Sequence, residues 1–283
     1  MDIQWYPGHM AKARKQVQQN LQLVDVVIEL LDARIPASSR NPDINAILQG
    51  KPRLVVLNKA DLADPIVTEA WLNYYRSEGL PTLAIDAHHG AGIKKMISLA
   101  EKQALPAVQK FMAKGRLARL ARCMVVGAPN VGKSMLINKL AGKKAARTGN
   151  RPGVTRGEQW IRLGGKLELL DTPGILWPKF EDQEVAYKLA ATGAIKEQIY
   201  DPEEICLKMV HWLWDKVPEN LVQRYKLDNV DEISENIWTI IEKIGAYRGF
   251  FLAGKKIDVN KTAVFIIKEF REGKLGRHSL EWP

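Results

Sequence analysis

The sequence predicts an α/β fold with a mainly parallel sheet, followed by a smaller, all-helical C-terminal domain. Through the first 180 residues, short apolar runs alternate with helical patterns, which favours parallel strands joined by right-handed crossovers. Beyond that point strand signals fade and helical patterns dominate. The length of 283 residues also suggests two domains. We therefore expect one domain over residues 1–180 and a second over 181–283.

Five apolar runs are predicted to form buried strands, because each is short, rich in branched residues and followed by a turn signal. They are Val24–Leu31, Leu54–Leu57, Thr82–Ile85, Cys123–Val126 and Leu167–Leu170. The segment Gln159–Leu163 lies before two glycines and predicts a hairpin that adds an antiparallel edge strand. Helical patterns lie between most of the strands, at Ala46–Gln49, Val67–Ser77, Ile93–Ala113 and Lys133–Leu140.

The second domain is predicted to consist of five helices. The prolines at 202 and 218 suit first helical turns. The helical patterns cover Glu184–Ala191, Pro202–Lys216, Glu219–Tyr225, Asp231–Gly245 and Asn260–Glu272.

Composition excludes several classes of protein. The apolar runs are far shorter than the roughly 20 residues that cross a bilayer. The first ten residues lack the basic and apolar regions of a secretory signal, and Cys123 and Cys206 have no nearby metal-ligand cluster. These features predict a cytoplasmic protein with reduced thiols and no membrane partner.

The charge is unevenly distributed along the chain, which has a net charge of +10. Residues 1–180 hold 27 Lys and Arg against 14 Asp and Glu, whereas residues 181–242 hold 6 against 14. The final 41 residues are basic again, with 9 against 4. A strongly basic chain favours a polyanionic partner, most often nucleic acid, although solvated lysines alone give the same composition.

Residues Gly127–Ser134 read GAPNVGKS and match the phosphate-binding P-loop pattern G-x-x-x-x-G-K-[ST]. The motif lies between a predicted strand and a predicted helix, as its chemistry requires. Backbone N–H groups, including that of Val131, would face the phosphates, and Gly132 would let the backbone approach them. Lys133 would reach the β- and γ-phosphates, and the Ser134 hydroxyl would ligate magnesium.

Residues Asn58–Asp61 read NKAD directly after a predicted strand and resemble the guanine-specificity motif of regulatory GTPases. The Asp61 carboxylate can accept hydrogen bonds from the ring N–H and the exocyclic amine of guanine, a pair that adenine lacks. Asn58 would contact the base edge or tie loops together, and the stem of Lys59 would pack over the base. Together with a P-loop, this tetrad predicts a GTP/GDP site.

Asp86-Ala87-His88 follows the next predicted strand and takes the place of the last base-contacting loop, which usually reads Ser-Ala-x. We expect the backbone of Ala87 to contact guanine. Asp86 replaces the usual serine, and its role stays open.

Asp171–Gly174 reads DTPG and resembles the D-x-x-G element, in which Asp171 would hold magnesium through water and the Gly174 amide would sense the γ-phosphate. Upstream, Thr155 lies in a Gly/Pro/Arg-rich loop and is the best candidate for the switch threonine that reaches magnesium. Thr148 is a less favoured alternative.

The order of these elements is circularly permuted. Ordinary GTPases run from the P-loop through the switches to N-K-x-D and the Ala loop, whereas here the two base-reading loops come first. A parallel sheet tolerates this rearrangement when the old termini are joined and the chain opens elsewhere. The predicted fold class is thus α/β, a P-loop GTPase fold with a circularly permuted motif order and a smaller C-terminal all-α domain.

Three further segments, with the permuted order, resemble the YlqF/YawG family of circularly permuted GTPases. They are WYPGHM at 5–10, DTPGILWP at 171–178 and FREGKLGR at 270–277. The resemblance covers essentially the whole chain. It implies a cytosolic, monomeric factor that binds a late precursor of the large ribosomal subunit, both rRNA and ribosomal proteins, and promotes its maturation. GTP hydrolysis would occur when the subunit stimulates it, and no DNA partner is expected.

The residue after D-x-x-G is Ile175, where classical small GTPases place a glutamine that orients the attacking water. Ile175 cannot do this. The resemblance implies that His9, in Pro-Gly-His-Met, is the catalytic residue, and an imidazole can orient water or relay a proton near neutral pH. Packing or capping of the following helix is the other interpretation of His9.

Asn130 matches the P-loop asparagine that helps bind potassium in cation-dependent GTPases. The match therefore implies activation by potassium, whereas a purely loop-stabilising asparagine would not.

Two basic clusters flank the predicted nucleotide site in sequence, and the basic tail supplies a second predicted RNA surface. Their contacts to phosphate would give affinity without sequence specificity. The clusters contain Lys110, Lys114, Arg116, Arg119 and Arg122, then Lys139, Lys143, Lys144, Arg147, Arg151 and Arg156. The tail contains Lys255, Lys256, Lys261, Lys268, Arg271, Lys274 and Arg277.

Two other functions remain open at this stage. Another RNA-associated translation GTPase would use the same nucleotide site but respond to transfer RNA or a protein activator. A non-catalytic, GTP-dependent RNA-binding module would bind tightly without stimulated turnover, which Ile175 permits. A P-loop ATPase or kinase is disfavoured by the NKAD tetrad.

Overall fold

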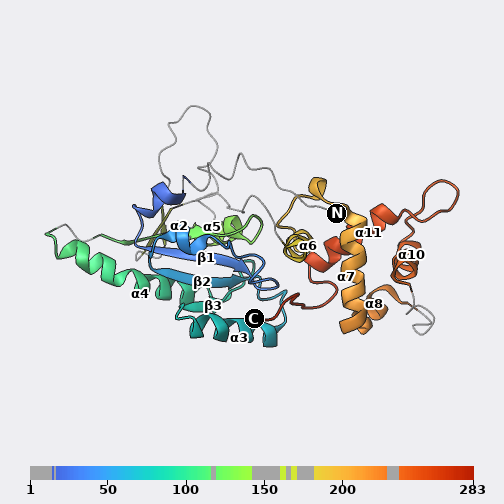
Figure 1. Cartoon of the computed structure of the whole chain (residues 1–283), viewed down its shortest axis with the longest axis horizontal. Helices are drawn as coiled ribbons and strands as arrows, with labels where there is room; N and C mark the ends of the chain where they lie inside the picture. The colour runs from blue at the N-terminus through green and yellow to red at the C-terminus, as the bar shows by residue number, and fades with distance from the viewer. Residues whose placement is uncertain are drawn as a thin grey trace, which may run out of the picture. The chain divides into compact units, whose positions relative to one another are not determined.

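The computed structural model describes residues 15, 17–115, 119–141, 160–163, 167–170, 182–227 and 236–283. These residues form two compact units (Figure 1). The sheet unit holds the described residues up to 170 together with Ser279–Pro283, and the helical unit holds those from 182 to His278. No helix within the described ranges is long and apolar enough to cross a membrane.

The sheet unit contains a six-stranded mixed sheet in the order β3-β2-β1-β4-β6-β5. Five strands are parallel, and β5 pairs antiparallel with β6, in register Trp160 to Leu170. The predicted parallel sheet and antiparallel edge strand are therefore confirmed. The strand bounds are β1 Val26–Asp32, β2 Arg53–Asn58, β3 Thr82–Ala84, β4 Ala121–Val126, β5 Trp160–Leu163 and β6 Leu167–Leu170.

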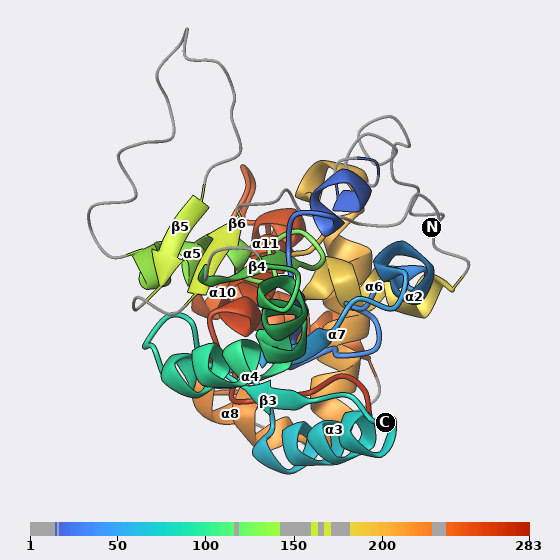
Figure 2. The ribbon, with the colours of Figure 1, turned by 90° about the vertical axis from the view of Figure 1, so that its left-hand side faces the viewer.

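Four helices connect or follow these strands: α2 Ile44–Leu48, α3 Pro65–Ser77, α4 Ile93–Met112 and α5 Lys133–Ala141. Asp64 caps α3, since its carboxylate accepts the N–H groups of Ile66 and Val67. Helix α3 packs against β3, whereas α4 packs against β1, β2 and β4; both helices can be followed in Figure 2. From β1 the chain continues through β2 and β3 toward one edge of the sheet, and β4 then lies on the other side of β1. The switch point therefore lies between β1 and β4, and ligands of open α/β sheets bind at the carboxyl ends of strands there.

One face of the sheet carries two apolar clusters. One cluster packs Val27 and Met124 against α2, and the other packs Leu31 and Leu57 against α3. Glu29 lies between Val27 and Leu31 on this face of β1 and is 1% exposed. Arg40 and Arg53 lie 3.2 and 3.1 Å from its carboxylate. Burial raises the pKa of Glu29 despite these two cations.

In the helical unit α7 is central and packs against α6, α8, α10 and α11. Its buried residues recur at helical spacing, from Ile205 and Cys206 to Leu213 and Trp214. Asp201 caps α7, which begins at Pro202 as predicted. The helices are α6 Gln183–Ala191, η2 Glu197–Ile199 (a 3-10 turn), α7 Pro202–Lys216, α8 Pro218–Tyr225, α10 Ile237–Tyr247 and α11 Val259–Arg271.

The helices predicted in both parts of the chain are present, with ends that shift by a few residues. The predicted helix over Asp231–Gly245 is described only from Ile237, because residues 228–235 lie outside the described ranges. A helical segment at 17–21 and the turn η2 were not predicted. Val17 and Leu21 are buried against α2, which is the tertiary contact that a local pattern does not reveal.

Candidate nucleotide-binding site

The P-loop connects β4 to α5 at the carboxyl end of the sheet, beside the switch point. Gly132 has φ +101°, and a Cβ there would lie 2.3 Å from Nδ2 of Asn58. Only glycine therefore allows this backbone and this neighbour together. Asn130 also adopts a left-handed backbone, with φ 57°, and its residue is exposed.

Lys133 is buried, and its ammonium donates to the carbonyl oxygens of Gly127 and Ala128 at 3.0 and 2.6 Å. The P-loop lysine is thus held across its own loop. Ser134 follows at the start of α5, and its residue is exposed. The start of α5 directs backbone N–H groups and the positive end of the helix dipole toward this loop, which favours an anion such as phosphate.

Asn58 ties three loops together. Its Nδ2 donates to the carbonyl oxygen of Val131 in the P-loop at 2.7 Å. Its Oδ1 accepts the backbone N–H of Ala87 at 3.0 Å. Of the two roles considered for Asn58, the structure shows the loop-tying one. The backbone of Ala87 was expected to contact guanine, and its N–H is bonded to Asn58 in the structure.

Asp86 organises the loop after β3, which answers the question left open by its replacement of serine. Its Oδ1 accepts the N–H groups of His88 and His89 at 2.8 and 3.0 Å, and its Oδ2 lies 2.5 Å from Nδ1 of His89. Burial would raise the pKa of Asp86, but the hydrogen bonds from His89 and His88 outweigh it and lower the pKa. Carboxylate oxygens of Asp61 and Asp86 and a ring nitrogen of His89 lie within 4.8 Å of one another.

Asp32 and Arg34 form a second network at the site that the sequence analysis missed. Asp32 ends β1 and pairs in register with Asn58. Arg34 donates from Nε to Oδ1 of Asp32 at 2.9 Å and from a terminal nitrogen to Oδ2 at 2.7 Å. The Lys59 ammonium lies 2.9 Å from the same Oδ2. The available signal was an Asp-x-Arg triplet at the end of a buried strand.

Four predicted site residues lie outside the described residues. They are His9, Thr155, Asp171 and Gly174, and the alternative Thr148 also lies there. The structure brings together the remaining predicted positions, from the NKAD loop, the Ala loop and the P-loop, at the carboxyl ends of β2, β3 and β4.

Three arginines of the predicted RNA surfaces make structural contacts within the chain. Arg119 donates two hydrogen bonds to the carboxylate of Asp25, at 2.7 and 2.8 Å, in a bidentate ion pair. Arg122 forms an ion pair with Glu168 at 3.2 Å. Arg271 donates to the carbonyl oxygens of Ala190 and Ala191 at the end of α6. Their position in basic clusters did not reveal these partners, because the contacts join residues far apart in sequence.

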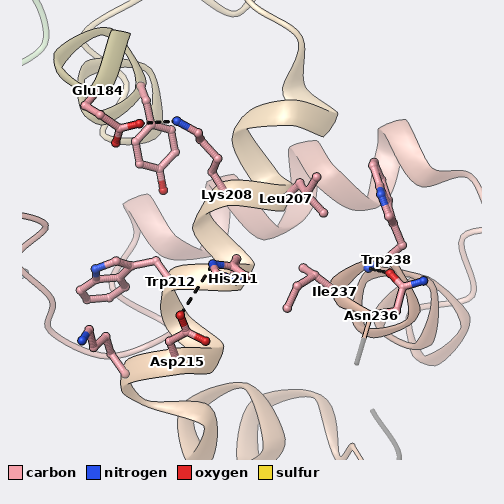
Figure 3. Close-up of a pocket in the computed structure, with 11 residues that line it drawn as sticks. Glu184, Leu207, Lys208, His211, Trp212, Asp215, Asn236, Ile237 and Trp238 are labelled. Carbon is pink, nitrogen blue, oxygen red and sulfur yellow. Dashed lines mark hydrogen bonds and ion pairs between the residues drawn. The ribbon is translucent and has the colours of Figure 1, made fainter. Parts of the chain in front are cut away.

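A groove of about 530 Å³ lies within the helical unit, between α6, α7 and α10. Figure 3 shows Trp238 of α10 on one side and Trp212 of α7 on the other. An ion pair joins Glu184 to Lys208, and His211 lies 3.7 Å from Asp215. Among the predicted nucleotide-binding residues that the structure describes, none lines this groove.

Comparisons with known proteins agree with the loop geometry. The family profile described as "50S ribosome-binding GTPase" matches residues 122–243. That match begins in β4, just before the P-loop, so the NKAD tetrad lies upstream of it, as a permuted order requires. Ribosome biogenesis GTPase A of Priestia megaterium is 51% identical over 284 residues, covering 100% of this chain and 98% of the relative.

The chain belongs to the ribosome biogenesis GTPase A family. The similarity extends to the same protein of Thermotoga maritima, at 31% identity over 99% of this chain and 95% of the relative. The crystal structure of GNP-bound YlqF from T. maritima matches with a TM-score of 0.67 and 27% identity, over 96% of this chain and 98% of that one. The GDP-bound structure of the same YlqF matches with a TM-score of 0.65 and 27% identity, over 95% and 99%. The circularly permuted GTPase fold predicted from the sequence is confirmed.

Proposed function

We propose that the chain is a cytoplasmic, monomeric GTPase that acts in late maturation of the large ribosomal subunit. It binds GTP, associates with the precursor subunit and hydrolyses GTP when the subunit stimulates it. The observation that supports this best is the pair of hydrogen bonds made by Asn58, which joins the base-reading loops to the P-loop. The relatives named for ribosome biogenesis support the choice of substrate and partner.

In this proposal Asp61 accepts the ring N–H and the amine of guanine, while Lys133 exchanges its loop carbonyls for the β- and γ-phosphates. The exchange keeps the ammonium paired throughout. The α5 N-terminus adds backbone N–H donors to the phosphates.

Magnesium prefers hard oxygen ligands, and the hydroxyl of Ser134, an exposed residue directly after the P-loop lysine, fits that preference. Thr155 and Asp171, the latter through water, complete the proposed magnesium set. The proposed potassium ligand is the amide oxygen of Asn130, a residue that is exposed. When bound, these cations neutralise the charge that develops on the transferring phosphoryl group.

His9 is the proposed catalytic residue, and Gly174 the sensor of the γ-phosphate. An imidazole orients the attacking water, a role that Ile175 cannot fill. The ribosomal subunit supplies the stimulus by bringing His9 toward the nucleotide.

The hairpin between α10 and α11 is the proposed rRNA contact of the helical unit. Phe251 pairs with Ile257 across it, and the N–H of Leu252 donates to the carbonyl oxygen of Lys256 at 2.7 Å. Phe251 is 52% exposed, and Lys255 and Lys256 are exposed beside it. An exposed aromatic ring flanked by lysines suits unpaired RNA, because bases stack on the ring and phosphates meet the cations.

The decisive experiment measures GTP turnover in potassium buffer with and without purified large ribosomal subunits. We expect strong stimulation by the subunit, lower turnover in sodium than in potassium, and loss of stimulation in His9→Ala with GTP binding retained. Intact GTP binding without stimulation would refute the ribosome-activated mechanism, and stimulation by transfer RNA alone would indicate another translation GTPase.

Phe251→Ala tests the hairpin, with Phe265→Leu, on the following helix, as a packing control. The first variant should weaken subunit binding by roughly tenfold, as the loss of one base–aromatic stack predicts. Equal binding by Phe251→Ala and the unmodified chain would remove the hairpin from the RNA surface.

A further inference from the structure

Asp32 occupies the carboxyl end of β1, at the switch point of the sheet and beside the first residue of the NKAD tetrad. It is 2% exposed, and its partner Arg34 is 1% exposed. Arg34 holds both oxygens of the carboxylate, and the Arg34 backbone N–H adds a third hydrogen bond at 3.1 Å to Oδ1. Arg34 alone therefore fixes the orientation of the Asp32 carboxylate, independently of Lys59.

Lys59 meets that fixed carboxylate from the base-reading loop. Its ammonium lies 2.9 Å from Oδ2 of Asp32, and its side chain is 22% exposed. Its backbone has φ 61°, a left-handed conformation that costs a non-glycine residue roughly 1 kcal/mol and needs support from its surroundings. The ion pair with Asp32 thus fixes the Lys59 ammonium at the end of the sheet. This fixed position sets the direction of the apolar stem of Lys59.

The ion pair persists over the physiological pH range. Burial alone would raise the pKa of Asp32, but Arg34 and Lys59 hold it well below its usual range. The two lysines of the site have different partners. The Lys133 ammonium donates to P-loop carbonyl oxygens, and the Lys59 ammonium pairs with Asp32.

We propose that Asp32 is a positioning residue for guanine recognition, which acts by holding the Lys59 stem against the face of the base. Arg34 orients Asp32 and does not contact the nucleotide. The inference rests on the proposed function, because it assumes that the NKAD loop binds guanine. It adds a determinant of nucleotide affinity that lies outside the NKAD, Ala and P-loop segments.

A double-mutant cycle tests the proposal through equilibrium binding of a fluorescent GDP analogue to Asp32→Asn, Lys59→Met and the double variant. Each single substitution should weaken binding by roughly tenfold, and the double variant should bind no more weakly than the weaker single one, as coupled neighbours do. Multiplied effects in the double variant, or Asp32→Asn binding within about twofold of the unmodified chain, would overturn it.

Competition by inorganic tripolyphosphate separates positioning from general damage, because this probe has no base to meet Lys59. Its affinity should be unchanged in the variants, and an equal loss of GDP and tripolyphosphate affinity would overturn the proposal. Glu269→Gln, a buried carboxylate substitution in the helical unit, is the matched control and should leave both affinities unchanged.

If Asp32→Asn does not fold, Lys59 carries the test, because its side chain is partly exposed. Lys59→Arg keeps a cation for Asp32 and should restore most of the affinity that Lys59→Met loses. Full affinity in Lys59→Met would overturn the proposal. Failure of the unmodified chain to bind GDP would instead refute the proposed function, so the two failures are distinguishable.

Discussion

Asp32 in the sheet unit and Glu269 in the helical unit are both buried carboxylates, and each lies close to two arginine or lysine side chains. The two carboxylates differ in the structural elements to which these partners belong. Asp32 is 2% exposed and binds Arg34 and Lys59. Glu269 is 3% exposed, pairs with Arg224 and lies 3.6 Å from Arg248. The Tyr225 hydroxyl donates to Glu269 at 3.0 Å.

The difference lies in what each network connects. Glu269 lies within α11, and its partners come from α8 and from Arg248, the residue that follows α10, so all of these contacts lie within the helical packing. Asp32 lies at the end of a strand, and one of its partners, Lys59, belongs to the NKAD loop that is proposed to bind guanine. Similar buried charges therefore stabilise the fold in one unit and, in our proposal, position a guanine-binding lysine in the other.

The largest expected effect concerns the loop that Asp32 supports. Asp61→Asn replaces the carboxylate that is proposed to accept two guanine hydrogen bonds with an amide that can donate to the 2-oxo group of xanthine. Loss of two charge-assisted hydrogen bonds should weaken GDP binding by at least about a hundredfold and shift preference toward xanthosine diphosphate. Equilibrium binding of the two nucleotides measures this.

Glu69→Gln on the exposed face of α3 is the control for Asp61→Asn and should leave GDP affinity unchanged. A variant Asp61→Asn that keeps its guanine preference would show that the NKAD loop does not read the base. The proposed functional difference between the Asp32 and Glu269 networks would then have no support.

A smaller effect is expected from Glu269→Gln. Removing one charge from a buried network leaves Arg224 and Arg248 without their shared carboxylate, so the helical unit should lose about 2 kcal/mol of unfolding free energy. GDP affinity should not change. A loss of GDP affinity equal to that of Asp32→Asn would erase the proposed difference between the networks.

One buried cysteine in each unit allows the two units to be followed separately. Cys123 lies in β4 and Cys206 in α7, and burial raises the pKa of both thiols. Both thiols should react slowly with an alkylating reagent until their unit opens. Glu269→Gln should speed the modification of Cys206 and leave Cys123 unchanged, as peptide mass spectrometry would show.

Acid should remove the stabilisation that Glu269 provides. Burial would raise the pKa of Glu269, but Arg224, Tyr225 and Arg248 outweigh it and lower the pKa in the folded state. Its contribution is therefore full above the ordinary carboxyl pKa, near 4, and is lost as the pH falls through the folded value. The stability difference between the unmodified chain and Glu269→Gln should shrink as the pH falls from 7 to about 3, measured by denaturant unfolding.

The sequence predicted features whose cause is local. The strand β2, Arg53–Asn58, contains the predicted Leu54–Leu57, and α7 begins at the predicted Pro202 behind its Asp201 cap. Apolar runs, caps and motif spacing act over a few residues, so a single chain reveals them. The motif-bearing loops follow their strands for the same reason.

Pairings between distant residues could not be predicted in the same way. Asn58 and Val131 are 73 residues apart, and no periodicity points from one to the other. Arg271 looked like a surface charge, although it closes the end of α6. The Asp32–Arg34 pair is local, but the contact that gives it a role, with Lys59, depends on the neighbouring strand.

The smallest expected effect comes from the last residues of the chain, Ser279–Pro283, which pack in the sheet unit. The Leu280 N–H donates to the carbonyl oxygen of Arg34 at 2.8 Å, and Glu281 accepts the Ser38 N–H and hydroxyl at 2.9 and 2.5 Å. These contacts hold the loop that carries Arg34, and so they bear indirectly on Asp32. Glu281→Ala should therefore weaken GDP binding by about twofold to threefold, since lost hydrogen bonds of this kind are worth roughly 1 kcal/mol of local stability.

Trp282→Ala is the control for Glu281→Ala, because Trp282 is the next residue and is 63% exposed. It should leave GDP affinity and the reactivity of Cys123 unchanged, whereas Glu281→Ala should raise that reactivity slightly. Equal effects of the two substitutions would mean that the terminal segment acts through general packing. An unchanged GDP affinity in Glu281→Ala would confine the positioning network to Asp32, Arg34 and Lys59, with no contribution from the end of the chain.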